Sequence, residues 1–237
     1  MDALVAAGLA ALGSAAAPGS AADPRSAADP RSAATLRVVL VPTAVARHRP
    51  ELAVAHGRRA FEAAAARAGI PVRVDAAMVL DRAGAAGPAF GALLAAAHVV
   101  HLPGGDPDLL PAVLRDTPAW AGILRAHARG ACVAGASAGA MALGERLWTR
   151  DGPAAGLGLV PGIAVLPHFD PARPGTWRQS VDPDGQLTWL GLDERTLVIG
   201  RPGGPWTVAG AGRAHLFPPG AAVPTVSAGP GERLPIG

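Results

Sequence analysis

From Leu36 onward, short apolar runs rich in β-branched residues alternate with longer segments of helical periodicity. This alternation is typical of an α/β protein. Because strands that are apolar along their whole length are buried on both faces, we predict a mostly parallel sheet with helices on both of its faces. The predicted strands cover residues 36–41, 72–79, 98–102, 132–136, 163–166, 197–199 and 206–209.

Two predicted helices carry start and stop signals. Apolar residues recur at helical spacing over residues 51–68, and Gly69 follows them as a stop signal. A second helix has Thr117 as its N-cap, Pro118 in its first turn and Gly130 just past its end.

The first 34 residues differ from the rest of the chain. Residues 3–12 are apolar and have no Lys or Arg ahead of them, which favours a short Ala-rich helix over a signal peptide. Two copies of SAADPR follow at residues 20–31, where little apolar bulk is available, so we expect a flexible linker. We therefore divide the chain into an N-terminal segment, 1–34, and a single α/β domain, 35–237.

The composition excludes several classes of protein. Half of the 237 residues are hydrophobic and 16% are charged, so the chain can bury a substantial core and is too apolar for a disordered protein. The single Cys132 allows neither an internal disulfide nor a thiolate zinc site, which favours a reducing, cytoplasmic location.

Charge and residue spacing also limit the partners. The net charge is only +3 and the Arg residues are spread among acids, so we expect no nucleic-acid partner. No apolar stretch is long enough to predict a membrane-spanning helix. No cluster of His and carboxylates has the spacing of metal ligands, and we expect neither a metal nor another cofactor.

The segment CVAGASAGAMALGER places Ser137 between an apolar strand and an Ala-rich helix. Small residues around a serine allow the sharp strand-to-helix turn that exposes its hydroxyl group, as in a nucleophile elbow. The backbone N–H of Ala138, at the start of the helix, would face developing negative charge. A small-residue turn without catalytic function is the alternative for such a motif taken alone.

Two further features support the catalytic interpretation. Gly104 and Gly105 follow the strand over 98–102, where bare backbone N–H groups can face a ligand and complete an oxyanion hole. Of the seven histidines, His168 directly follows an apolar strand, and an imidazole at that strand end could serve as the base for Ser137.

Together these motifs resemble the serine peptidase family of aspartyl dipeptidase and cyanophycinase, which has a class I glutamine amidotransferase-like fold. The resemblance implies Ser137 as nucleophile, His168 as base, and Gly105 with Ala138 as oxyanion donors. It covers roughly residues 36–217, and the matching blocks are LPGGDPDLL at 102–110, GASAGAMALGER at 135–146, GLGLVPGIAVLPHFD at 156–170, GLDERTLVIG at 191–200 and VAGAG at 208–212.

The acid of the triad is less closely defined by the resemblance. The family's acid follows its serine by roughly fifteen residues, which points to Asp151, while Glu145 and Asp170 remain alternatives. Asp193 and Glu194 match an Asp-Glu pair of the family, which implies a place in the substrate pocket. A plain turn before a strand explains this pair equally well.

The resemblance implies a hydrolytic domain that cleaves peptide or isopeptide bonds through an acyl-enzyme, next to an Asp-like residue of a small peptide. A homodimer is also compatible. Two alternatives stay open: an inactive amidotransferase-like binding module, and an α/β-hydrolase-type esterase, since GASAG also satisfies GxSxG. A Cys-dependent amidotransferase is disfavoured, because the elbow holds Ser137 and Cys132 lies earlier in the strand.

One departure from the family concerns the start of the domain. Members usually begin with a strand that ends in a GGGE-like turn, and nothing of that kind precedes Leu36. We expect either a misplaced gene start or the absence of one strand.

Overall fold

The computed structural model describes residues 1–15, 35–172, 178–201 and 203–236. The chain forms two compact units by its internal contacts. Unit 1 comprises Met1–His101 and Asp116–Ala134, and unit 2 comprises Leu102–Arg115 and Gly135–Gly237. The linker predicted over the SAADPR copies lies outside the described residues.

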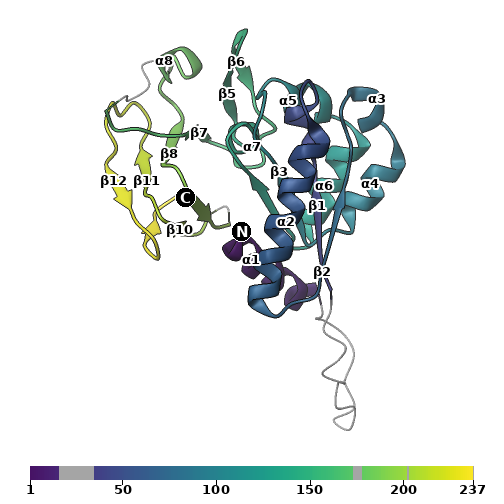
Figure 1. Cartoon of the computed structure of the whole chain (residues 1–237). Coiled ribbons are helices and arrows are strands. Elements are labelled where there is room, and N and C mark those ends of the chain that lie inside the picture. Colours follow the sequence, from purple (N-terminus) through teal and green to yellow (C-terminus); the bar gives the residue numbers. More distant parts are fainter. Residues whose placement is uncertain (16–34, 173–177, 202, 237) are drawn as a thin grey trace. The chain divides into compact units, whose positions relative to one another are not determined.

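A four-stranded sheet in the order β2-β1-β3-β4 forms the centre of unit 1 (Figure 1). β1 pairs in parallel with both β2 and β3. The α/β class with a parallel sheet flanked by helices is therefore confirmed. The strands are β1 (Leu36–Leu40), β2 (Val72–Ala76), β3 (Val99–Leu102) and β4 (Cys132–Gly135).

Two helices of unit 1 have the boundary residues that the sequence predicts, α2 at its end and α6 at its start. α2 (Pro50–Ala68) packs on β1 and β2 and stops at Gly69, which has a left-handed φ of 67°. α6 (Pro118–Ala128) begins at Thr117, whose hydroxyl oxygen accepts the N–H of Trp120. The others are α1 (Asp2–Ala15), which contacts α2 and β1, η1 (Pro42–Val45), α3 (Arg82–Ala85) and α4 (Pro88–Ala95), which packs against α6.

Unit 2 is built mainly from antiparallel strands, which the sequence pattern indicated only in part. One sheet has the order β12-β11-β8-β7, in which only β7 and β8 are parallel, a second has the order β13-β10-β9, and β5 with β6 forms a hairpin. The strands are β5 (Arg146–Thr149), β6 (Gly152–Ala155), β7 (Ile163–Pro167), β8 (Thr188–Leu192), β9 (Thr196–Ile199), β10 (Trp206–Gly210), β11 (Ala214–Phe217), β12 (Val226–Ala228) and β13 (Arg233–Leu234).

Apolar side chains from the two larger sheets of unit 2 form a common core, with Val165, Leu190, Val208 and Leu216 among its members. The described part of the unit also contains three short helices: α5 (Leu109–Leu114), α7 (Ala138–Leu143) and α8 (Arg178–Val181). Among the described residues, no helix combines the length and the hydropathy that a membrane crossing requires.

Candidate active site

Ser137 occupies a sharp turn between the end of β4 and the start of α7. Its backbone has φ 50° and ψ −114°, a conformation that an L residue adopts only when its surroundings enforce it. A Cβ atom on Gly139 would lie 2.1 Å from the carbonyl oxygen of Leu102, and one on Gly135 would lie 2.3 Å from the carbonyl carbon of Gly139. Both glycines of GASAG are therefore required by close backbone approach, and the serine is held as in a nucleophile elbow.

His168 follows β7 directly and brings its imidazole to the serine. Its Nε2 atom lies 2.9 Å from the Oγ of Ser137, which is hydrogen-bonding distance. Like Ser137, His168 has a positive φ, here 54°. Two adjoining side chains thus project from backbone positions that are conformationally costly.

Glu194 completes the chain of contacts from the turn between β8 and β9. Its Oε1 lies 2.6 Å from Nδ1 of His168. The side chains of His168 and Glu194 are 59% and 75% exposed, so the contact faces solvent. Ser137, His168 and Glu194 therefore form a continuous array of hydroxyl, imidazole and carboxylate groups.

The pairing of β7 with β8 explains why these last two residues meet. The strands are parallel, and Pro167 lies opposite Leu192 in the register. Residues that follow parallel strands emerge at the same edge of the sheet. The N–H of Phe169 also donates to the carbonyl oxygen of Leu192, at 2.9 Å, which joins the two outgoing segments.

The loop after β3 lies against the serine. A Cβ atom on Gly104 would lie 3.1 Å from the Cβ of Ser137, so the glycine permits a close approach. Gly105 has a φ of 149°. The next residue, Asp106, is buried, and its Oδ1 lies 2.7 Å from the guanidinium of Arg150 in the β5–β6 turn. This ion pair joins the glycine loop to the hairpin.

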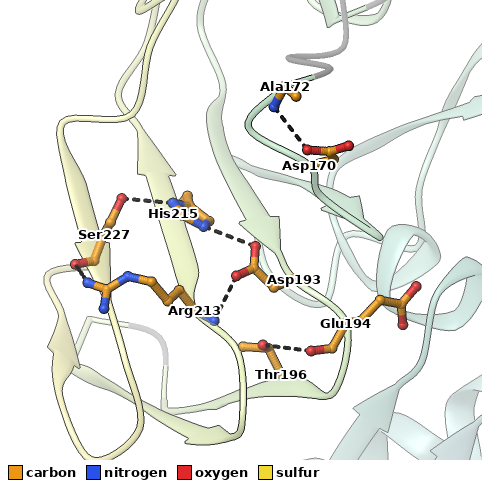
Figure 2. A network of polar contacts seen from close by, with 8 residues as sticks. All are labelled: Asp170, Ala172, Asp193, Glu194, Thr196, Arg213, His215 and Ser227. Atoms are coloured by element: carbon orange, nitrogen blue, oxygen red, sulfur yellow. Dashed lines mark hydrogen bonds and ion pairs between the residues drawn. The ribbon is translucent and has the colours of Figure 1, made fainter.

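The structure differs from the sequence expectation at the acid. The acceptor at Nδ1 of His168 is Glu194 rather than Asp151, which is exposed in the β5–β6 turn and whose N–H donates to Thr149. Because Nδ1 carries one proton, one carboxylate fills this position. The other two candidates for the acid have separate contacts: Glu145 accepts the N–H of Gly162 and Asp170 that of Ala172. Asp193, which was expected in the substrate pocket, accepts the N–H of Arg213 (Figure 2).

The structure brings Ser137, His168 and Gly104 close together, and Gly105 and Ala138 directly follow Gly104 and Ser137 in the chain. Ala138 is buried as the first residue of α7. Glu194 was expected only in a substrate pocket, and the missed signal is strand β8: had residues 188–192 been assigned as a strand parallel to β7, Glu194 would have been placed beside His168.

The chain is similar to known proteins over most of its length. The family model for peptidase family S51 matches residues 27–202. A crystal structure of a peptidase from an acI-B1 actinobacterium has 25% sequence identity and a TM-score of 0.70, covering 98% of this chain and 88% of that one.

A candidate peptidase E protein from Listeria monocytogenes EGD-e has 19% identity and a TM-score of 0.52, covering 74% of this chain and 86% of that one, and it bears on the fold alone. No curated protein matches the chain.

Proposed function

Since this chain belongs to peptidase family S51, we propose that it is a serine peptidase that cleaves peptide or isopeptide bonds through an acyl-enzyme on Ser137. The observation that carries the proposal is the pair of contacts at His168: 2.9 Å from Nε2 to Ser137 Oγ and 2.6 Å from Nδ1 to Glu194 Oε1. This is the arrangement that a hydroxyl nucleophile, its base and an orienting acid require.

The proposed reaction begins when Ser137 Oγ attacks the carbonyl carbon of the scissile bond while its proton passes to Nε2 of His168. The resulting tetrahedral intermediate collapses as the imidazolium returns that proton to the leaving amine. Water then attacks the acyl-enzyme, again with His168 as base, and releases the acid product and free Ser137. The carboxylate of Glu194 accepts the Nδ1–H bond, which leaves Nε2 free of a proton at the start of each cycle.

We assign the oxyanion-binding role to the backbone N–H groups of Gly105 and Ala138. Support comes from the contact of the glycine loop with Ser137 and from the position of Ala138 directly after the nucleophile. Donors fixed in place before the reaction stabilise the negative oxygen without a reorganisation cost. The ion pair between the buried Asp106 and the exposed Arg150 would hold this loop in position.

For the substrate, we propose a small peptide with an Asp-like residue next to the cleaved bond, as the resemblance to aspartyl dipeptidase and cyanophycinase implies. An arginine near the site would bind such a carboxylate. Arg150 supports this best, because 69% of its side chain stays exposed while it pairs with Asp106. Arg146 instead donates to the carbonyl oxygen of Val181.

The test compares hydrolysis of Asp-X and β-Asp-X dipeptides by the wild-type protein and by Ser137→Ala. We expect turnover by the wild type and a loss of about 10⁴-fold or more in the variant, because the nucleophile is removed. Ser180→Ala, at an exposed serine of α8, is the matched control and should retain activity.

A serine-directed fluorophosphonate separates the alternative functions. Labelling of the wild type but not of Ser137→Ala supports a serine hydrolase, and turnover of esters without peptides would indicate an esterase. A folded wild-type protein that is neither labelled nor active would contradict the proposal in favour of a binding module.

A further inference from the structure

A second histidine, His215 of β11, lies behind the turn that carries Glu194. Its side chain is only 8% exposed. Its Nε2 lies 3.0 Å from Oδ1 of Asp193, and its Nδ1 lies 2.7 Å from the Oγ of Ser227 (Figure 2). His215 is therefore fixed at both ring nitrogens by polar groups from two other segments of unit 2.

The chemistry of these partners determines the direction of the hydrogen bonds. An ionised carboxylate only accepts, so Nε2 of His215 donates to Asp193. In the neutral ring, Nδ1 is then the acceptor, and the hydroxyl group of Ser227 donates to it. The imidazole bridges Asp193, at the end of β8, to Ser227 on β12.

Asp193 also forms hydrogen bonds with the backbone of Arg213, the residue directly before β11. Its Oδ2 accepts the N–H of Arg213 at 3.0 Å, and its own N–H donates to the Arg213 carbonyl oxygen at 3.1 Å. With one oxygen on Arg213 and the other on His215, the carboxylate cannot rotate without breaking a hydrogen bond. The backbone from which the next residue, Glu194, extends is fixed in consequence.

The same imidazole packs against the segment that carries the catalytic base. The ring of Phe169, the residue after His168, lies 4.8 Å from the His215 ring between centroids. Phe169 in turn lies against β8, since a Cβ atom on Gly191 would come within 2.9 Å of its ring. His215 therefore contacts the chain neighbour of His168 and the chain neighbour of Glu194.

We propose that His215 is a positioning residue that holds Glu194 against His168. This inference rests on the proposed function, in which Glu194 is the acid of the triad, and it states that His215 and Asp193 fix the turn from which Glu194 extends. His215 does not touch substrate, so its removal should lower kcat and leave KM nearly unchanged. Outer residues that orient a first layer of functional groups typically contribute about 10- to 100-fold.

The first experiment measures dipeptide hydrolysis by His215→Phe and His215→Gln. Phenylalanine keeps the ring packing but loses the hydrogen bond to Asp193, so we expect a fall in kcat of about 10- to 100-fold with KM changed less than about twofold. Glutamine can donate an amide N–H to Asp193 and should recover most of the loss. The control is His56→Phe, an exposed histidine of α2, which should leave kcat unchanged.

A double-mutant cycle distinguishes positioning from general support of the fold. If His215 acts through Glu194, His215→Phe should change kcat less than about twofold in a Glu194→Gln background. Equal losses in both backgrounds would overturn the proposal. Should His215→Phe fail to fold, Asp193→Asn replaces it, because an amide cannot accept from both His215 and the Arg213 N–H at the same oxygen positions.

A measurement without substrate keeps this inference separate from the proposed function. The proton between Nδ1 of His168 and Glu194 should give a far-downfield NMR resonance in the wild type that is lost in Glu194→Gln. We expect the resonance to be lost or broadened in His215→Phe and retained in His215→Gln. A wild type without peptidase activity but with this pattern would refute only the proposed function, whereas an unchanged resonance in His215→Phe would refute the role of His215.

Discussion

The two units of the chain differ in how their backbones relate to local conformational preferences. In unit 1, parallel strands alternate with helices that begin and end at residues suited to those positions, such as Thr117 and Gly69. Among the described residues, one non-glycine residue of unit 1 has a positive φ, Asp116, whereas unit 2 has three: Ser137, His168 and Arg195. Two of these are the proposed nucleophile and base, and the third follows the proposed acid.

This difference indicates that the two units contribute differently to stability and to activity. Unfavourable backbone conformations persist only when the surrounding structure enforces them, and they concentrate at functional sites. The helix ends of unit 1 agree with local sequence signals, and we infer that this unit contributes mainly to stability. In unit 2, part of the packing free energy offsets the unfavourable backbone conformations of the turns at the site. Substitutions should then separate into changes in activity and changes in stability.

Among the substitutions that compare the two units, the largest expected effect is on activity in unit 2, from Glu194→Gln. The amide keeps the shape but cannot stabilise the imidazolium that forms during the reaction, so we expect kcat/KM to fall about 10²- to 10⁴-fold. Because the side chain is 75% exposed, the melting temperature should stay within about 1 °C of the wild type. Steady-state kinetics and thermal unfolding measure the two quantities.

Glu62→Gln, on the exposed face of α2 in unit 1, is the matched control and should change neither quantity. The assignment of the acid fails if Asp151→Asn lowers kcat/KM by more than Glu194→Gln does.

The acid also illustrates how far sequence reasoning reaches in this chain. The elbow at Ser137 and the base at His168 follow from local signals, because each lies directly after a recognisable apolar strand. The contact with Glu194 depends on strand β8, whose short segment TWLGL contains Gly191 and lacks the β-branched run of β1. Without that strand, only the resemblance to the family places Glu194 near the site, and no local pattern places it at the same sheet edge as His168.

The presence or absence of a recognisable apolar run also explains which strands were predicted and which were missed. The strands of unit 1 that the sequence pattern predicts have mostly apolar side chains, and in β3 all four residues are buried, His101 included. The strands missed in unit 2 are short and include polar or small residues, such as His215 in β11. Their pairing depends on neighbours distant in sequence, which a local pattern does not encode.

A second prediction tests whether the turn at Ser137 affects both stability and activity. A Cβ atom on Gly139 would meet the Leu102 carbonyl oxygen at 2.1 Å, so Gly139→Ala must displace backbone. We expect a loss of about 3 kcal/mol in the free energy of unfolding, together with reduced kcat in the remaining folded protein. Chemical denaturation and kinetics on the same samples provide both values.

Gly204→Ala is the matched control, because the atom nearest to its added Cβ is 3.6 Å away, an ordinary contact. This variant should lose less than about 1 kcal/mol. If Gly139→Ala were equally mild, the turn at Ser137 would not depend on the close approach of the two backbones.

The smallest predicted effect concerns stability alone, at His101 in unit 1. Burial lowers the pKa of this imidazole to about 4, and its Nδ1 atom has no hydrogen-bond partner within the described part of the chain. The unfolded chain binds a proton near the model-peptide pKa of about 6.5, while the folded chain stays neutral until about pH 4. Stability is therefore complete above pH 6.5 and falls as the pH decreases toward 4, by roughly 2 to 3 kcal/mol.

His101→Phe removes the titrating group and retains a ring beside Phe61, whose centroid lies 5.7 Å from that of His101. The variant should be more stable than the wild type at pH 4.5, with a smaller difference at pH 7.5, because only the wild type must bury an imidazole that the unfolded state prefers to protonate. Chemical denaturation at both pH values measures the difference in the free energy of unfolding between the two proteins. The titration of carboxylates contributes equally to both proteins and therefore cancels from this difference. A constant difference across this range would show that His101 does not make unit 1 sensitive to acid.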